Sequence, residues 1–319
     1  MKALIFPGQG SQSVGMGNEL YKKFDLVKKV FREADAKLNY SISKIILDGP
    51  ESDLKLTKNT QPAILTISYS IFKLITEEFN VDLKKDITFY AGHSLGEYSA
   101  LVASGSLSFS DAVLLLHQRG KLMQEAVPNG KGSMIAVMGL DLNEINKFID
   151  EINSDKGVCE VANDNSYSQI ILSGDKSAIE EISKNLKNNK KKSIPLPVSA
   201  PFHCSLMKPA AKKMEKNIFE TNFNNPRVQI VSNVTAQATK NSDDIKKLLV
   251  EQIFSKVRWR ESVEYMIDNG VKEFIEIGPG KVLSGLVKRI NDKVLSKSLN
   301  TIDEIQNLKW LILKIFTSL

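Results

Sequence analysis

The segment that most constrains the fold is GHSLG at residues 92–96, which lies between a strand-like run and a helix-like run. Residues 86–91 before it form a short, mostly apolar run that is typical of a strand, and residues 97–103 after it favour a helix. A Gly-x-Ser-x-Gly sequence between a strand and a helix is typical of a nucleophile elbow, whose serine occupies a sharp turn and projects its hydroxyl at the helix N-terminus. We therefore predict an α/β unit here, with Ser94 as a candidate nucleophile.

Strand-like and helix-like segments alternate along much of the chain, which indicates an α/β fold with a mainly parallel sheet. A short apolar strand is expected at residues 3–6, and further strands at 228–232 and 273–277. Two more helices are predicted, one over residues 61–79 with Thr60 as its cap and one beginning at Ser110. A C-terminal amphipathic helix is predicted from Leu308, Leu311, Ile312 and Ile315.

From about residue 128 the order of elements changes. The patterns predict strands at 132–140, 158–163, 169–173 and 193–198, helices around 142–152 and 179–186, and a turn at 164–166. This β-α-β-β-α-β order is a split-βαβ unit. We predict a small domain of residues 128–198, inserted into a large domain made of residues 1–127 and 199–319.

Composition excludes several classes of protein. No stretch of about 18 apolar residues is present, so we expect no membrane association, and the N-terminal apolar run is too short for a signal peptide. The chain has 43 Lys and Arg against 37 Asp and Glu, a net charge of +6. Because the lysines are dispersed and aromatic residues make up only 7%, we do not expect a nucleic acid partner.

Cofactor motifs are also missing. The glycines at 8–17 and 278–281 match neither the dinucleotide fingerprint nor the P-loop. The two cysteines and three histidines do not have the spacing of metal ligands. Two cysteines far apart in the sequence indicate reduced thiols and not a disulfide framework. We therefore expect a cytoplasmic protein without a metal ion or a cofactor.

A serine nucleophile needs a base, and the chain offers three histidines. His93 lies in the elbow itself, where its ring does not fold back easily onto the neighbouring hydroxyl. His117 falls on an apolar helix face, where a hydrogen-bonded core histidine is the more common case. His203 follows the predicted small domain in a proline-containing loop and is the candidate base by elimination, although a loop histidine without a catalytic role is the alternative.

Arg119 lies two residues after His117 on the same predicted helix. A surface arginine is the usual interpretation of such a position. If the side chain instead points toward Ser94, its planar fork would match a carboxylate on the acyl group. Sequence spacing does not decide between these two interpretations.

Taken together, the segments resemble the malonyl-CoA:acyl carrier protein transacylase (FabD-type) family of fatty acid synthesis. The resemblance runs almost from end to end of the chain. It is carried by FPGQGSQ at 6–12, TQPA at 60–63, GHSLGEY at 92–98, RG at 119–120, VSAPFH at 198–203, SNVTA at 232–236, VRW at 257–259 and EIGPG at 276–280, together with Asn163, Gln169 and Gln252.

The resemblance implies an α/β-hydrolase-like large domain with an inserted ferredoxin-like small domain. It implies transfer of a malonyl group from malonyl-CoA to the phosphopantetheine thiol of holo-acyl carrier protein, an acidic partner that would suit the basic chain, by a monomeric enzyme. The implied catalytic residues are Ser94, His203 and Gln252; the oxyanion would bind the amides of Gln9 and Leu95; and the substrate would contact Arg119, Asn163, Gln61 and His93.

Two alternative functions remain compatible with these residues. A hydrolase would use the same serine and histidine with water as acceptor, and acidic residues between 94 and 203 could complete its triad. The absence of an H-G-G-G-type oxyanion loop disfavours it. A non-catalytic binding module would not need an elbow serine, a further histidine and an arginine that matches a carboxylate.

Overall fold

The computed structural model describes residues 1–83, 87–152, 154–198 and 200–307 of the chain. The predicted C-terminal helix with Leu308, Leu311, Ile312 and Ile315 lies outside these residues. The helices are α1 (Asn18–Lys23), α2 (Asp25–Leu38), α3 (Ile42–Asp48), α4 (Glu51–Lys55), α5 (Thr57–Lys73), α6 (Gly96–Ala103), α7 (Phe109–Glu125), α8 (Leu142–Asp150), α9 (Lys176–Asn188), α10 (Lys208–Glu220), α11 (Ser242–Gln252), α12 (Trp259–Asp268) and α13 (Val282–Ile290).

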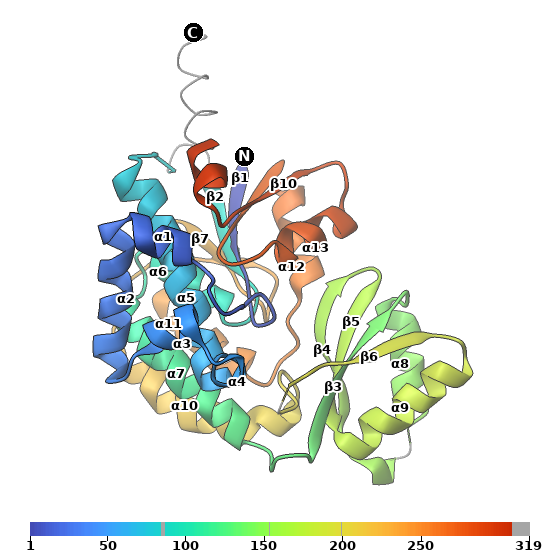
Figure 1. Cartoon of the computed structure of the whole chain (residues 1–319). Coiled ribbons are helices and arrows are strands. Elements are labelled where there is room, and N and C mark those ends of the chain that lie inside the picture. Colours follow the sequence, from blue (N-terminus) through green and yellow to red (C-terminus); the bar gives the residue numbers. More distant parts are fainter. Residues whose placement is uncertain (84–86, 153, 199, 308–319) are drawn as a thin grey trace.

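The strands form two separate sheets (Figure 1). The larger has the order β10-β9-β1-β2-β7-β8, and its first five strands run parallel. The smaller has the order β4-β5-β3-β6 and is antiparallel. The strands are β1 (Lys2–Phe6), β2 (Ile87–Gly92), β3 (Gly132–Met138), β4 (Cys159–Ser166), β5 (Gln169–Asp175), β6 (Lys192–Pro195), β7 (Gln229–Val231), β8 (Ala238–Thr239), β9 (Glu273–Ile277) and β10 (Leu295–Leu299).

Both faces of the larger sheet are covered by helices. Ala3 and Ile5 of β1 point into a core shared with α12 and α13, whereas Leu4 and Phe6 point into a second core shared with α2, α5 and α7. This alternation is the two-residue period of a strand buried on both sides. Because β1, β2 and β7 run parallel, their carboxyl ends meet at one edge of the sheet, where the loops that follow them lie side by side.

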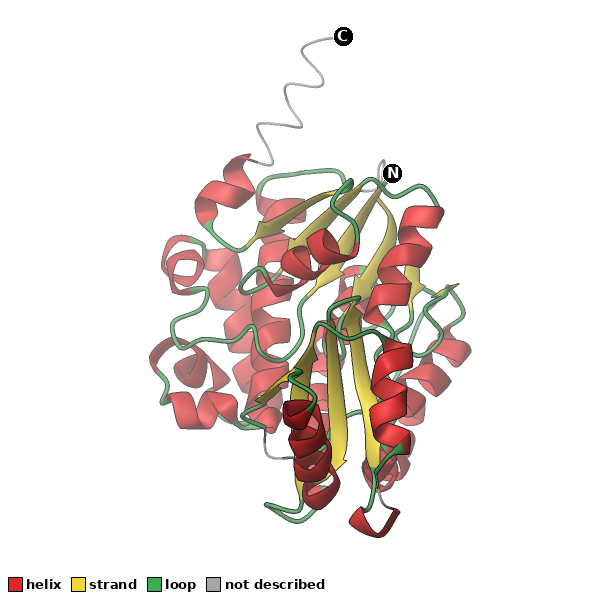
Figure 2. Ribbon diagram, turned by 90° about the vertical axis from the view of Figure 1, so that its right-hand side faces the viewer, coloured by secondary structure: helices red, strands yellow, loops and turns green. Residues whose placement is uncertain are grey.

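The smaller sheet carries its own two helices, α8 and α9, on one face. Ile135 and Val137 of β3 pack against α8 and α9, on the side turned away from the larger sheet (Figures 1 and 2). Met134 and Ala136 of the same strand point the opposite way and join the core that Leu4 and Phe6 share with α2, α5 and α7. If β3, β4, β5 and β6 are numbered 1 to 4 in chain order, their order across the sheet is 2-3-1-4, which is the ferredoxin-like order. The predicted fold class is therefore confirmed.

Two local predictions are wrong. Thr60 does not cap a helix: α5 already begins at Thr57, and the Thr60 hydroxyl donates to the carbonyls of Leu54 and Leu56. Residues 164–166 are not a turn but the end of β4, where two register shifts keep polar side chains within a paired strand. The chain reverses at 167–168 instead. The domain boundaries at 128 and 198 stay a prediction.

None of the helices in the described ranges has the length and apolarity needed to cross a membrane.

Candidate active site

The turn between β2 and α6 forces Ser94 out of ordinary backbone geometry. A β-carbon on Gly92 would lie 1.9 Å from the carbonyl carbon of Gly96, and one on Gly96 would lie 2.2 Å from the Phe6 oxygen. Only glycine permits strand and helix to approach this closely. Between them Ser94 has a φ of 53°, a left-handed conformation that non-glycine residues adopt rarely. The elbow predicted from the sequence is therefore present.

The structure brings His203 onto the Ser94 hydroxyl. Its Nε2 lies 2.8 Å from Ser94 Oγ, although the two residues are 109 positions apart. His203 Nδ1 lies 2.9 Å from the backbone oxygen of Gln252. Because a carbonyl only accepts, Nδ1 carries the proton and the lone pair of Nε2 faces the hydroxyl. This is the tautomer that a general base requires.

The same surroundings keep the His203 ring neutral. Burial, and then the positive charge of Arg119, lower the pKa of His203 to about 3. His203 also has a φ of 59°, so both residues of the pair lie on strained turns. A neutral imidazole accepts a proton, and any negative charge placed beside Arg119 would weaken the second of these two effects and raise its basicity.

The other two histidines have different surroundings. His117 Nδ1 lies 3.0 Å from the Lys58 oxygen and 3.3 Å from the Tyr40 hydroxyl, which makes it a hydrogen-bonded helix histidine. His93 Nε2 lies 2.8 Å from Asn165 Oδ1 and 3.2 Å from Asn163 Nδ2. The shorter contact makes Nε2 the donor toward Asn165, and burial lowers the pKa of His93.

Arg119 points into the site, not toward solvent. Its side chain is fully buried, and its Nη2 donates to Ser94 Oγ at 3.1 Å. The same nitrogen donates to Gln252 Oε1 at 2.9 Å, while Nη1 donates to Gln61 Oε1 at 2.8 Å. Within the described ranges, Nε has no hydrogen-bond partner. No carboxylate among the described residues forms an ion pair with this guanidinium, so a buried positive charge is held only by neutral oxygens.

Gln252 contributes through two different groups. Its backbone oxygen orients His203, at the place where a hydrolase would position a carboxylate. Its side-chain amide lies on the other side, where Oε1 accepts from Arg119 and Nε2 donates to Ser94 O at 3.1 Å. The orienting group behind the histidine is thus a neutral carbonyl, which sequence alone did not distinguish from the side chain.

These residues line a cavity of about 350 Å³ between the two sheets. Gln9, Gln61, His93, Leu95 and Asn163 all contribute to its wall, together with Ser94, Arg119 and His203. Gln252 lies behind the wall. Within the described part of the chain, the backbone N–H groups of Gln9 and Leu95 have no protein acceptor, and both residues border the cavity beside Ser94. Two unpaired amides at this position can donate to an oxygen that develops negative charge.

Three functional neighbours were missed by the sequence analysis. Asn233 Oδ1 accepts from the Ser94 N–H at 2.7 Å, and its Nδ2 donates to the Gly92 oxygen at 2.7 Å, so this side chain clamps the elbow. Asn165 holds His93. Glu97 Oε2 accepts a hydrogen bond from Gln252 Nε2 at 2.7 Å. The only sequence signal for Asn233 and Glu97 is their place inside the SNVTA and GHSLGEY segments, and Asn165 lies in the segment for which the sequence predicts a turn.

Among residues 1–83, 87–152, 154–198 and 200–307, no three His, Cys, Asp or Glu side chains are grouped as metal ligands.

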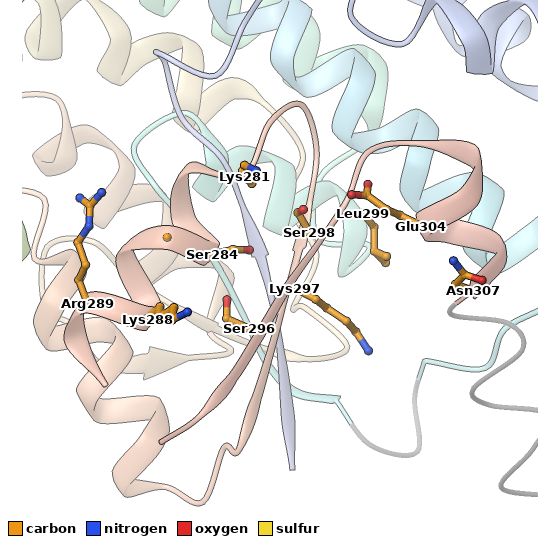
Figure 3. Close-up of a pocket in the computed structure, with 11 residues that line it drawn as sticks. Lys281, Ser284, Lys288, Arg289, Ser296, Lys297, Ser298, Leu299, Glu304 and Asn307 are labelled. Atoms are coloured by element: carbon orange, nitrogen blue, oxygen red, sulfur yellow. The ribbon is translucent and has the colours of Figure 1, made fainter. Parts of the chain in front are cut away.

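A second hollow of about 830 Å³ lies between α13 and β10 (Figure 3). Four of its lining residues are basic, namely Lys281, Lys288, Arg289 and Lys297. Lys281 lines this basic groove, and the next residue, Val282, lines the cavity that contains Ser94. The first residues of α13 and its N-cap thus contribute to both hollows.

Comparison with known proteins assigns the chain to a family. A model of the acyl transferase domain matches residues 3–302. Malonyl CoA-acyl carrier protein transacylase of Bacillus subtilis (strain 168) is 45% identical over 293 residues, which cover 92% of this chain and 91% of that protein.

Two solved structures agree. An acyl-carrier-protein-S-malonyltransferase from Bartonella henselae has a TM-score of 0.94 and 40% identity, covering 97% of this chain and 98% of that chain. A malonyl-transacylase in complex with its type II PKS acyl-carrier protein has a TM-score of 0.91 and 39% identity. The match covers 96% of this chain and 98% of that chain. The chain belongs to the acyl transferase family and, within it, to the malonyl CoA-acyl carrier protein transacylases.

Proposed function

We propose that the protein transfers a malonyl group from malonyl-CoA to the phosphopantetheine thiol of acyl carrier protein, through a malonyl ester of Ser94. The observation that carries this proposal is the fully buried Arg119, which has no carboxylate partner in the described residues and whose Nη2 lies 3.1 Å from Ser94 Oγ. A buried guanidinium without a counter-charge is costly unless a ligand supplies one. A malonyl group carries its carboxylate two bonds beyond the thioester carbonyl. With the carbonyl at Ser94 Oγ, this carboxylate can supply the missing negative charge beside Arg119.

In the first half-reaction, His203 Nε2 removes the proton from Ser94 Oγ as the oxygen attacks the thioester carbonyl. The oxyanion accepts hydrogen bonds from the amides of Gln9 and Leu95, and removal of one such donor from an enzyme costs about 3 kcal/mol of transition-state stabilisation. The tetrahedral intermediate then collapses, the C–S bond breaks, and His203 returns the proton to the leaving thiolate of coenzyme A.

In the second half-reaction, the thiol of the carrier protein occupies the place that coenzyme A has left. His203 takes its proton, the sulfur attacks the ester carbonyl, and Ser94 recovers its hydrogen as the malonyl group departs. The malonyl carboxylate pairs with Arg119 throughout, which offsets the positive charge that depresses the pKa of His203 in the empty site. Bound substrate thus makes the base stronger.

Hydrolysis by the same residues is less well supported. In Ser-His-Asp hydrolases a carboxylate behind the histidine stabilises the imidazolium, whereas His203 has the neutral Gln252 carbonyl at 2.9 Å. The cavity wall contributed by the small sheet is apolar or uncharged, which favours an acyl ester that waits for a thiol instead of reacting with water.

The basic groove beside the cavity supports an acidic partner. Lys281, Lys288, Arg289 and Lys297 line this groove, beside one acidic residue, Glu304. Lys281 directly precedes Val282, which lines the cavity of Ser94, and this supports an approach of the carrier protein from this side. Opposite charges speed and orient such encounters. Action as a monomer in the cytoplasm stays a prediction.

The test is to incubate the protein with radiolabelled malonyl-CoA, digest it and identify the labelled peptide. We expect the label on the peptide that contains Ser94, and we expect holo-acyl carrier protein, but not the apo form without phosphopantetheine, to remove it. Ser94→Ala is the control and should bind no label while keeping the wild-type circular dichroism spectrum. Label on another peptide, or label retained by Ser94→Ala, contradicts the proposal.

A further inference from the structure

Glu97 is a buried carboxylate that the reaction described above does not use. It lies in the first turn of α6, three residues after Ser94, and is 2% exposed. One of its oxygens, Oε2, accepts from Gln252 Nε2 at 2.7 Å and from the Asn233 N–H at 3.0 Å. No Lys, Arg or His side chain of the described residues forms an ion pair with it. A carboxylate buried without a direct cation is costly, so its position calls for an explanation.

The nearest cation reaches Glu97 through one side chain. The Gln252 amide donates from Nε2 to Glu97 and accepts at Oε1 from Arg119 Nη2, at 2.7 and 2.9 Å. The order is therefore carboxylate, amide, guanidinium. Hydrogen bonds in such a chain polarise one another, so the negative charge of Glu97 strengthens Gln252 Oε1 as an acceptor for Arg119.

An amide between the two charges has a consequence that a direct ion pair would not have. A carboxylate in contact with Arg119 would occupy the planar fork and exclude the substrate carboxylate. A carboxylate one amide away leaves the fork accessible, yet it still lowers the positive potential there. We propose that Glu97 is a positioning residue that acts as a relayed counter-charge for Arg119, and that its negative charge limits how strongly the site prefers malonyl over an uncharged acyl group. This inference rests on the proposed function.

The charge of Glu97 can be switched without mutation. Burial raises the pKa of Glu97 to about 7, against the lowering effects of the Asn233 and Gln252 hydrogen bonds and of Arg119. Among the other ionisable groups around it, burial lowers the pKa of His93, lowers that of His203 to about 3 and raises that of Tyr98 to about 12. Arg119 stays charged.

The experiment measures kcat/KM for malonyl-CoA and for acetyl-CoA from pH 6.0 to pH 8.5 and takes their ratio. Both substrates use Ser94, His203 and the same thiol, so titration of those groups cancels in the ratio. At pH 6.0 Glu97 is protonated and the potential at Arg119 is most positive. We expect the ratio of the wild-type enzyme to fall on the order of tenfold as pH rises and Glu97 ionises.

Glu97→Gln keeps an acceptor oxygen but has no charge. Its ratio should stay constant over the same pH range, at the high value that the wild type shows at pH 6.0. The matched control is Glu276→Gln, which neutralises another buried carboxylate, one that accepts from the N–H groups of Leu283 and Ser284. Glu276→Gln should follow the wild-type profile.

A wild-type ratio that does not change between pH 6.0 and 8.5 overturns the inference, and this result does not depend on the folding of any variant. A Glu97→Gln profile parallel to the wild type, or a Glu276→Gln profile as flat as that of Glu97→Gln, overturns it as well. Malonyl labelling of wild-type Ser94, recorded in the same series, tests the proposed function separately. Normal labelling with a flat ratio removes only the role of Glu97.

Discussion

The two sheets contribute to the cavity in different ways. From the large parallel sheet and its helices come the hydroxyl, the imidazole and the charge, namely Ser94, His203 and Arg119. From the small antiparallel sheet come only uncharged side chains, such as Met134, Asn163, Asn165, Gln169 and Ile171. A parallel sheet gathers the loops after its strands at one edge, whereas an antiparallel sheet sends them to both ends. The first arrangement concentrates reactive groups, and the second supplies a wall.

This contrast predicts that changes on the large-sheet side alter the chemistry or the charge preference, while changes on the small-sheet side alter all substrates alike.

Replacing His203 by alanine removes the imidazole that lies 2.8 Å from Ser94 Oγ and that we propose as the base. We expect the rate of malonyl-enzyme formation at pH 7 to fall about 10²- to 10⁴-fold, the range for loss of a positioned general base. Rapid-quench measurement of labelled protein gives this rate. Near-normal acylation in a folded His203→Ala protein would refute the base assignment and would remove the main difference between the two sides of the cavity.

Replacing Arg119 by alanine removes the charge but not the nucleophile. We expect kcat/KM for malonyl-CoA to fall on the order of a hundredfold, because hydrogen bonds to a charged group are lost, and the value for acetyl-CoA to change only slightly. Arg119→Lys should give an intermediate loss, since it keeps the charge but lacks the planar fork. Equal losses on both substrates would show that Arg119 does not select the acyl group.

Glu97 makes stability depend on pH. Its pKa is about 7 in the fold, against an ordinary value of 4.5, so the folded state binds more protons than the unfolded state between these values. The favourable contribution is complete below about pH 4.5 and is lost by about pH 7, an effect of about 3 kcal/mol. Over this range the free energy of unfolding of the wild type should fall more than that of Glu97→Gln. Parallel urea-denaturation curves for the two proteins at each pH would argue against a raised pKa.

Asn165→Ala tests the small-sheet side. It removes the acceptor that holds His93 at 2.8 Å, one hydrogen bond of about 1 kcal/mol. We expect kcat/KM to fall by less than about tenfold, and by the same factor for malonyl-CoA and acetyl-CoA. A selective loss for malonyl-CoA would place the recognition of charge on both sheets and would end the contrast.

The parts of the site that follow from neighbouring residues were predictable. The elbow depends on two glycines within five residues, and the β-α-β-β-α-β unit depends on local periodicity. Both are present, because sterics and hydrophobic pattern act over short distances along the chain. The turn predicted at 164–166 was wrong for the converse reason. Asp164 pairs with Arg260 at 2.8 Å and Asn165 with His93, so distant partners stabilise polar side chains inside a strand.

For Ser94 and His203, residue types and the family resemblance were enough to name the pair, although a separation of 109 positions carries no signal of contact. The local elements, and the chemistry that each side chain can perform, follow from the residues alone. The packing of distant segments buries Arg119 and turns the Gln252 carbonyl, not its side chain, toward His203. The same packing connects Glu97 to Arg119 through the Gln252 amide. Burial and hydrogen-bond partners depend on segments far apart in the chain, which meet only after the sheets have packed.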